Sequence, residues 1–356
     1  MWPYFLILVL LLFVRIYSET VPQKRRNYFI CVFSFIVLFL FSALRSETVG
    51  GDLERYLPEY ENVEATPFLS LFLDGLYREP GYLLIEKLFG YVMPSHRGYL
   101  IFTSFIILFL FFKAIYRYAD DVFIPILLFY LVLFGNSLNI LRASMATAIC
   151  LNSFQYIYNR NFGKFLLLTI LAALIQKTAI AFIPIYFLYG RTIKPVVLFS
   201  LIAGVVLFVL AFSGSSLASF VNTYSQLFAI EEDSEYLIEN PSIVNPMFFF
   251  LLGLTCLGVY GQKISRKTDE TLNFFVLVMA TATCIQAFSS VFTMMNRIAY
   301  FYYAFVIFYI PYLIFTVFRR KTNKVVILSV ILLLIFYMFV NGLIKDPQMI
   351  TPYELL

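Results

Sequence analysis

The sequence predicts an all-α, polytopic integral membrane protein. Of its 356 residues, 61% are hydrophobic and only 13% are charged, whereas soluble domains average roughly 25% charged residues. The mean hydropathy is +0.85, and the apolar residues gather into runs long enough to cross about 30 Å of hydrocarbon as helices. Helices suit lipid because they satisfy every backbone polar group internally. The chain is therefore expected to form a single transmembrane domain over residues 1–356.

About ten apolar runs are expected to cross the membrane completely. They are residues 2–17, 28–44, 98–116, 122–138, 143–158, 195–212, 246–261, 272–291, 298–317 and 325–341. Two further pieces, 80–93 and 164–190, are expected to be short re-entrant or broken helical segments, because the first is short and the second is interrupted by Gln176-Lys177-Thr178. The alternative for the second piece is one continuous tilted helix with Lys177 buried against a carboxylate, since a lysine facing lipid costs about 2.5–3.5 kcal/mol.

The distribution of lysine and arginine orients the chain, because cytoplasmic loops carry an excess of both. If the two short segments enter and return on the same side, most of the 26 basic residues fall on one side, which is then cytoplasmic. The long loops 45–79 and 213–245, with most of the carboxylates, fall on the outer side. If 80–93 crossed fully, Lys113 and Arg117 would move outside and the bias would weaken. The first topology is therefore favoured.

Cysteine and histidine usage argues against several kinds of chemistry. The four cysteines lie within apolar runs, no CxxC pair occurs, and His96 is the single histidine. Neither a disulfide framework nor a zinc site is expected, and no cofactor is indicated. The net charge of +5 is spread over short loops rather than concentrated in one patch, so nucleic acid is not an expected partner.

Two arginines on the predicted outer side point to an anionic ligand. Arg142 follows NSLNIL and opens RASMATAICL, and Arg297 follows MMN and opens RIAYFYYAF, so both are expected at helix N-termini. The helix dipole disfavours a cation there unless an anion shares the site. The pattern predicts a bound diphosphate or similar head group, with Arg45 and Lys177 as second-choice ligands. The alternative is that these side chains extend to the interface or pair with loop carboxylates.

Two carboxylates on the same side are candidates for acid-base chemistry. Asp52 follows Gly50-Gly51 and precedes Tyr56 and Tyr60 by four and eight residues, so a helix there would place all three side chains on one face. Such a face suits a sugar-binding wall or a supported general base. The alternative for Asp52 is an Asx turn or cap. Glu79 lies before Pro80, which fits either an N-terminal cap or a functional carboxylate at membrane depth.

The motifs occur in an order that resembles the EpsG/Wzy-like polysaccharide polymerases. The set extends from about residue 45 to residue 301 and comprises R-x4-GGD-x3-Y-x3-Y from Arg45, EPGY from Glu79, R-x3-A from Arg142, T-A-x4-P-x-Y from Thr178, and R-x2-YF from Arg297. Members of that family usually carry a histidine just before the Ser/Thr-Ala pair. Here Gln176-Lys177 precedes Thr178-Ala179, so no histidine role is carried over.

The resemblance implies a GT-C-like glycosyltransferase in the bacterial cytoplasmic (inner) membrane, with its active site facing the periplasm or cell exterior. Its substrates would be an undecaprenyl-diphosphate-linked oligosaccharide donor and acceptor, polymerised into O-antigen, capsule or exopolysaccharide. A chain-length regulator and a flippase are further implied partners. The competing hypotheses are a transporter or flippase for a lipid-linked or anionic solute, and an O-antigen ligase.

Each candidate residue has an expected role in this chemistry. Arg142 and Arg297, then Arg45 and Lys177, are expected to neutralise the diphosphate without a metal ion. Asp52 is the first candidate for the general base, and Glu79 the second. The expected substrate-binding residues are Tyr56, Tyr60, Tyr82, Gln176 and Tyr300.

Overall fold

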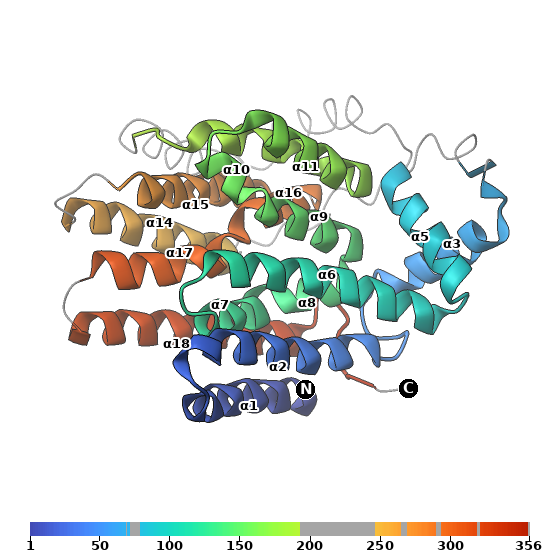
Figure 1. The fold of residues 1–356 in the computed structure, drawn as a ribbon, viewed down its shortest axis with the longest axis horizontal. Helices are drawn as coiled ribbons and strands as arrows, with labels where there is room; N and C mark the ends of the chain where they lie inside the picture. Colours follow the sequence, from blue (N-terminus) through green and yellow to red (C-terminus); the bar gives the residue numbers. More distant parts are fainter. Residues whose placement is uncertain are drawn as a thin grey trace, which may run out of the picture. The chain divides into compact units, whose positions relative to one another are not determined.

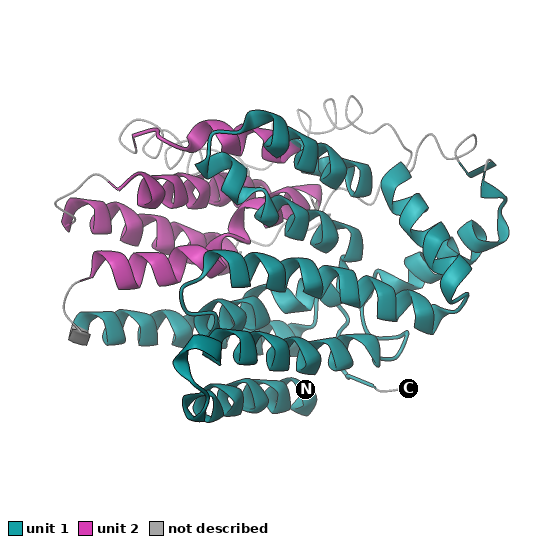
Figure 2. Cartoon of the chain, viewed as in Figure 1, with its two compact units in different colours: residues 1–180, 319–356 teal, residues 181–318 magenta. Residues whose placement is uncertain are grey.

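The computed structural model describes residues 1–68, 70–71, 79–192, 246–264, 269–289, 293–318 and 321–354. The described residues are 84% helical and contain no strand, which confirms the all-α expectation. The chain divides into two compact units, Met1–Ile180 with Arg319–Leu356 (unit 1) and Ala181–Phe318 (unit 2), coloured separately in Figure 2. The predicted outer loop 213–245 and the predicted span 195–212 lie outside the described residues.

Seven helical segments in the described part are long and apolar enough to cross a membrane. They are α1 (Trp2–Tyr17) with the 3-10 turn that follows it, α2 (Gln23–Ala43), α6 (His96–Tyr118), α14 (Pro246–Ile264), α15 (Glu270–Phe288), the segment Met294–Val317, and α18 (Lys321–Lys345). Each coincides with a predicted span. The predicted span 122–138 forms a shorter apolar helix, Phe123–Asn139, and 143–158 forms two helices that meet at Ser153.

Unit 1 is a stack of helices around α9 (Leu141–Asn152). In Figure 1, α1, α2, α6, α9 and α11 (Phe162–Ile175) follow one another, and each packs on the next. Every residue of α9 except Ile149 is buried. The small residues Ala143, Ser144, Ala146 and Ala148 explain this position, because they let neighbouring helices approach closely. The start of α9 is thereby fixed at the centre of the unit.

The predicted outer loop 45–79 contains helix α3 (Leu53–Ala65), which packs on α5 (Pro80–Val92) at one end of unit 1 (Figure 1). At about 1.5 Å per residue, the 13 residues of α5 rise roughly 20 Å, less than the hydrocarbon thickness. The buried Nζ of Lys87 on α5 donates to the carbonyls of Val63, Glu64 and Thr66, at 3.1, 2.7 and 2.9 Å. A cation at the C-terminal end of α3 also complements the helix dipole.

The interruption predicted in 164–190 is confirmed. Helix α11 ends at Ile175, Gln176 is extended, and a 3-10 run (η3) follows from Lys177 to Leu188. A single continuous tilted helix is therefore wrong. The end of α11 packs closely on α5, because a Cβ added to Gly81 would lie only 2.8 Å from Cβ of Leu174. This close approach explains the glycine in the EPGY motif.

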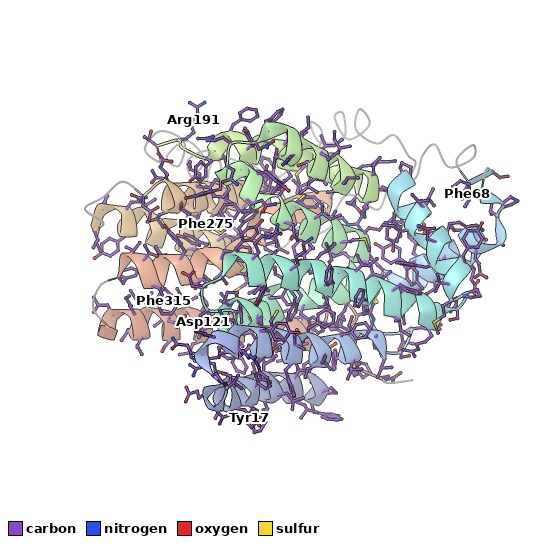
Figure 3. The ribbon with its side chains drawn as sticks, viewed as in Figure 1. Tyr17, Phe68, Asp121, Arg191, Phe275 and Phe315 are labelled. Carbon is purple, nitrogen blue, oxygen red and sulfur yellow. The ribbon has the colours of Figure 1, made fainter. Side chains whose placement is uncertain are left out.

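Unit 2 has an aromatic interior. Phe275 of α15 packs against Phe305, Tyr309 and Tyr312, with ring centroids 6.5, 6.2 and 5.6 Å away, whereas Phe315 is exposed (Figure 3). Tyr309 belongs to α17 (Val306–Tyr312), and its hydroxyl donates to the carbonyl of Leu254 on α14 at 2.8 Å. Aromatic packing and this buried hydrogen bond join α14, α15 and α17.

Candidate functional site

The Gly50-Gly51 turn is held from two sides within unit 1. Gly50 has φ +117°, and a Cβ added there would lie 2.6 Å from the carbonyl oxygen of Leu138. The backbone N–H groups of Gly50 and Gly51 donate to the carbonyls of Met349 and Gln348, at 2.7 and 3.0 Å. Gly50 is thus explained by its positive φ and by the close approach of the Leu138 backbone, whereas a Cβ on Gly51 would meet only the Met349 side chain, at 3.2 Å. The turn places Asp52 directly at the start of α3.

Replacing Gly50 with alanine is expected to destabilise the protein. A side chain at this φ costs about 1–3 kcal/mol, and the added methyl would also press on the Leu138 carbonyl. The yield of monodisperse protein and the midpoint of thermal unfolding in detergent should both fall. Gly342→Ala is the matched control, because a Cβ there meets nothing within 4 Å. Equal melting of the two variants would contradict this account of the turn.

Asp52 occupies the N-cap position of α3, but its carboxylate makes no capping hydrogen bond. Instead, its backbone N–H donates to Oδ1 of Asn139 at 2.8 Å, and Tyr56 Oη donates to Asp52 Oδ2 at 3.5 Å. Asp52 and Tyr56 therefore lie on one helical face, as their spacing predicts. The capping alternative does not describe the Asp52 side chain.

Arg142 is the second residue of α9, at the helix N-terminus as predicted. Its side chain is only 10% exposed, and Nη1 lies 3.2 Å from Oε2 of Glu79, whose side chain is 13% exposed. The guanidinium carbon lies 5.0 Å from the ring centre of Tyr56 and 5.7 Å from that of Tyr82. Cation-π contacts with two rings hold the guanidinium plane in place.

The Arg142–Glu79 pair is suited to exchange one anion for another. Removing one member of a buried ion pair leaves an uncompensated charge, at a cost of roughly 3–5 kcal/mol. Nε of Arg142 is buried and has no hydrogen-bond partner among the described residues. A guanidinium with spare donors binds phosphate oxygens in the same forked geometry as a carboxylate. A phosphate group could therefore replace the Glu79 carboxylate without leaving Arg142 unpaired.

Behind this pair is a network of buried tyrosines. The hydroxyls of Tyr82 and Tyr99 are 2.5 Å apart, and the rings of Tyr60 and Tyr99 are 4.9 Å apart. Tyr60 Oη donates to the carbonyl of Met93 at 3.3 Å. Burial, then Glu64 and Glu86, raise the pKa of Tyr60 to about 12, so its hydroxyl stays protonated. Tyr56, Tyr60 and Tyr82 are all buried, and they support the site rather than forming an open wall.

Arg45 is fully buried and binds backbone and hydroxyl oxygens. Its Nη1 donates to the carbonyl and Oγ of Ser42, and its Nη2 donates to the carbonyl of Leu138 at 3.0 Å. Burial lowers the pKa of the guanidinium to about 10, so it remains charged at neutral pH. In this structure Arg45 fixes the end of α2 against α8 (Phe134–Asn139).

The other predicted site residues come from the helix break after α11 and from α16 of unit 2. Gln176 is buried at the helix break, and Lys177 is exposed. Arg297 is half-buried at the fifth position of α16 (Thr293–Tyr303), so the expectation that it begins its helix is wrong. The helix starts earlier because Met294 and Met295 have good helix propensity. Tyr300, on the same helix, is fully buried, with its ring 5.3 Å from that of Tyr303.

Two polar residues near the site were not predicted. Asn139, three residues before Arg142, holds the backbone of Asp52. His96 lies between Glu47 and Glu61, with Nδ1 and Nε2 at 3.0 and 2.8 Å from the carboxylate oxygens. The two carboxylates raise the pKa of the His96 imidazole, which opposes the effect of its partial burial. Within the described residues, no group of three or more His, Cys, Asp or Glu side chains is placed to hold a metal ion.

Together, these features define a multi-pass helical membrane protein with a buried arginine–carboxylate pair at the start of two helices, α9 and α5. The chain belongs to the EpsG family, whose model matches residues 28–355. Membership indicates a polysaccharide polymerase-like role in exopolysaccharide biosynthesis. No curated protein and no solved structure matches the chain.

Proposed function

We propose that the protein is a glycosyltransferase that polymerises undecaprenyl-diphosphate-linked oligosaccharide repeat units into a surface polysaccharide. It acts in the bacterial cytoplasmic membrane, with its site on the outer face. One observation carries the proposal: Arg142 is held between Tyr56 and Tyr82, and the hydroxyl of the same Tyr56 meets the carboxylate of Asp52. Arg142, which would bind the leaving diphosphate, and Asp52, the candidate base, therefore both contact Tyr56.

Arg142 binds the diphosphate of the donor. The arriving phosphate takes the place of the Glu79 carboxylate, which is 3.2 Å from Nη1 before binding. Because the two tyrosine rings already fix the guanidinium, little reorganisation accompanies the growth of negative charge on the leaving oxygen. A preorganised donor of this kind contributes roughly 10²–10³ in rate where it has been removed in other enzymes.

Asp52 is the general base. As the acceptor hydroxyl oxygen forms its bond to the anomeric carbon of the donor, its proton passes to the Asp52 carboxylate. The bond between the anomeric carbon and the diphosphate oxygen breaks, and the lipid diphosphate leaves with the electron pair. Glu79 is the weaker candidate, because its carboxylate already accepts a hydrogen bond from Arg142 at 3.2 Å.

A reconstitution assay tests this function. The purified protein in nanodiscs is given lipid-diphosphate-linked repeat units, and the products are separated on a gel. A ladder of lengths is expected. A single conjugate with lipid A would favour a ligase, and movement of the lipid-linked unit across the bilayer without a covalent product would favour a transporter or flippase. Either result would overturn the polymerase proposal.

A further inference from the structure

The joint between α8 and α9 contacts both halves of the candidate site. Ile140, with φ −83° and ψ 71°, separates the two helices. Just before it, the carbonyl of Leu138 accepts from buried Arg45, and Oδ1 of Asn139 accepts from the N–H of Asp52. Just after it, Arg142 contacts Glu79 and two tyrosine rings. The short segment from Leu138 to Arg142 thus contacts Asp52, the proposed base, and contains Arg142, the proposed diphosphate-binding residue.

We propose that Asn139 is the positioning residue for Asp52: its amide oxygen fixes the first turn of α3 relative to Arg142. This inference rests on the proposed function. The N–H groups at a helix start have no partner within the helix, and the N–H of Asp52 finds its acceptor on Asn139, 87 positions along the chain. The contact therefore fixes the base by tertiary structure rather than by the local helix.

The turn before Asp52 needs such a contact. Gly50 and Gly51 are conformationally permissive, so the position of Asp52 depends on what holds the turn from outside. Met349 and Gln348 hold the two glycines, whereas Asn139 holds Asp52 itself. A general base acts only within about 2.6–3.2 Å of the proton that it accepts, and a displacement of about 1 Å can lower a rate roughly 100-fold.

Two substitutions at Asn139 separate positioning from folding. Asn139→Ala removes the acceptor, so kcat for polymer formation should fall roughly 100-fold, while KM for the lipid-linked donor stays within about twofold because Arg142 is untouched. Asn139→Asp keeps an oxygen acceptor and adds a negative charge beside Asp52. Because the oxygen acceptor is restored, polymer formation should recover. Because the added charge disfavours ionised Asp52, the pH below which polymer formation declines should be higher than in the wild-type protein.

The matched control is Asn27→Ala, which also removes a side-chain-to-backbone hydrogen bond, here to the carbonyl of Asp120 at 2.7 Å. It should leave kcat and the pH profile unchanged. A wild-type kcat in Asn139→Ala, or an Asn139→Asp variant as inactive as Asn139→Ala at every pH, overturns the positioning role. If the wild-type protein itself forms no ladder, the proposed function is what fails; a wild-type ladder with unaltered Asn139→Ala kinetics contradicts the positioning role alone.

Discussion

Replacing Arg142 with alanine is expected to abolish the polysaccharide ladder, with kcat/KM falling at least about 100-fold. The guanidinium lies between Tyr56 and Tyr82 and contacts Glu79. Alanine therefore removes the positive charge that these contacts hold in place. Binding of the lipid-linked donor should weaken as well. Steady-state kinetics and direct donor binding, both in nanodiscs, measure the two effects.

Arg142→Ala leaves a buried negative charge without a partner, so a second variant is needed that removes this charge as well. Arg142→Ala alone strands the buried carboxylate of Glu79, so the double variant Arg142→Ala/Glu79→Gln keeps the pocket neutral. Arg55→Ala is the matched control, since Arg55 is an exposed arginine of α3 that pairs with Glu59 at 3.2 Å. The control should lose less than about twofold, because exposed pairs contribute little. A folded double variant that still forms the full ladder contradicts the diphosphate role of Arg142.

Asp52→Asn is expected to lower kcat by roughly 10²–10⁴ while leaving donor binding unchanged. Asparagine has the shape of aspartate and keeps the backbone N–H that Asn139 accepts, so the turn should persist while the proton acceptor is lost. The measurement is kcat at saturating donor, alongside a donor-binding titration. Normal turnover in this variant would remove Asp52 from the mechanism.

Glu79→Gln is the comparison that distinguishes the two carboxylates. If Glu79 only occupies Arg142 until the diphosphate arrives, its neutral replacement should hold kcat within about tenfold and lower KM for the donor, because the competing charge has gone. If Glu79 were the base, Glu79→Gln would be inactive and Asp52→Asn active. The two variants therefore give opposite results under the two assignments.

Local sequence patterns predicted the helical features of the site but not its tertiary contacts. The spacing of Asp52 and Tyr56 placed both on one face of a helix, and the polar stretch at Gln176 marked the break after α11. Both features depend on neighbours within a few residues. The pairing of Glu79 with Arg142 joins residues 63 positions apart, which no local periodicity encodes.

The candidate cations show the same distinction. Arg45 follows an apolar run and Arg142 precedes one, which ranks Arg142 first as a diphosphate ligand but does not identify the partner of either arginine. The structure directs Arg45 to the carbonyls of Ser42 and Leu138 but directs Arg142 to a carboxylate. Whether Arg45 or Arg142 is available to bind a ligand depends on the partner of each side chain. Helix packing determines these partners, and the neighbouring residues in the sequence do not.

The hydrogen bonds between the Gly-Gly turn and residues 348–349 constrain the order in which the protein matures. These residues leave the ribosome roughly 300 positions after Gly50, and Tyr353 and Glu354 add further bonds to Phe41 and to Ser46. The turn that presents Asp52 cannot take its final form until this late segment has been made and has returned to α2. Formation of the Gly-Gly turn is thus coupled to the synthesis and insertion of α18, which precedes residues 348–349 in the chain.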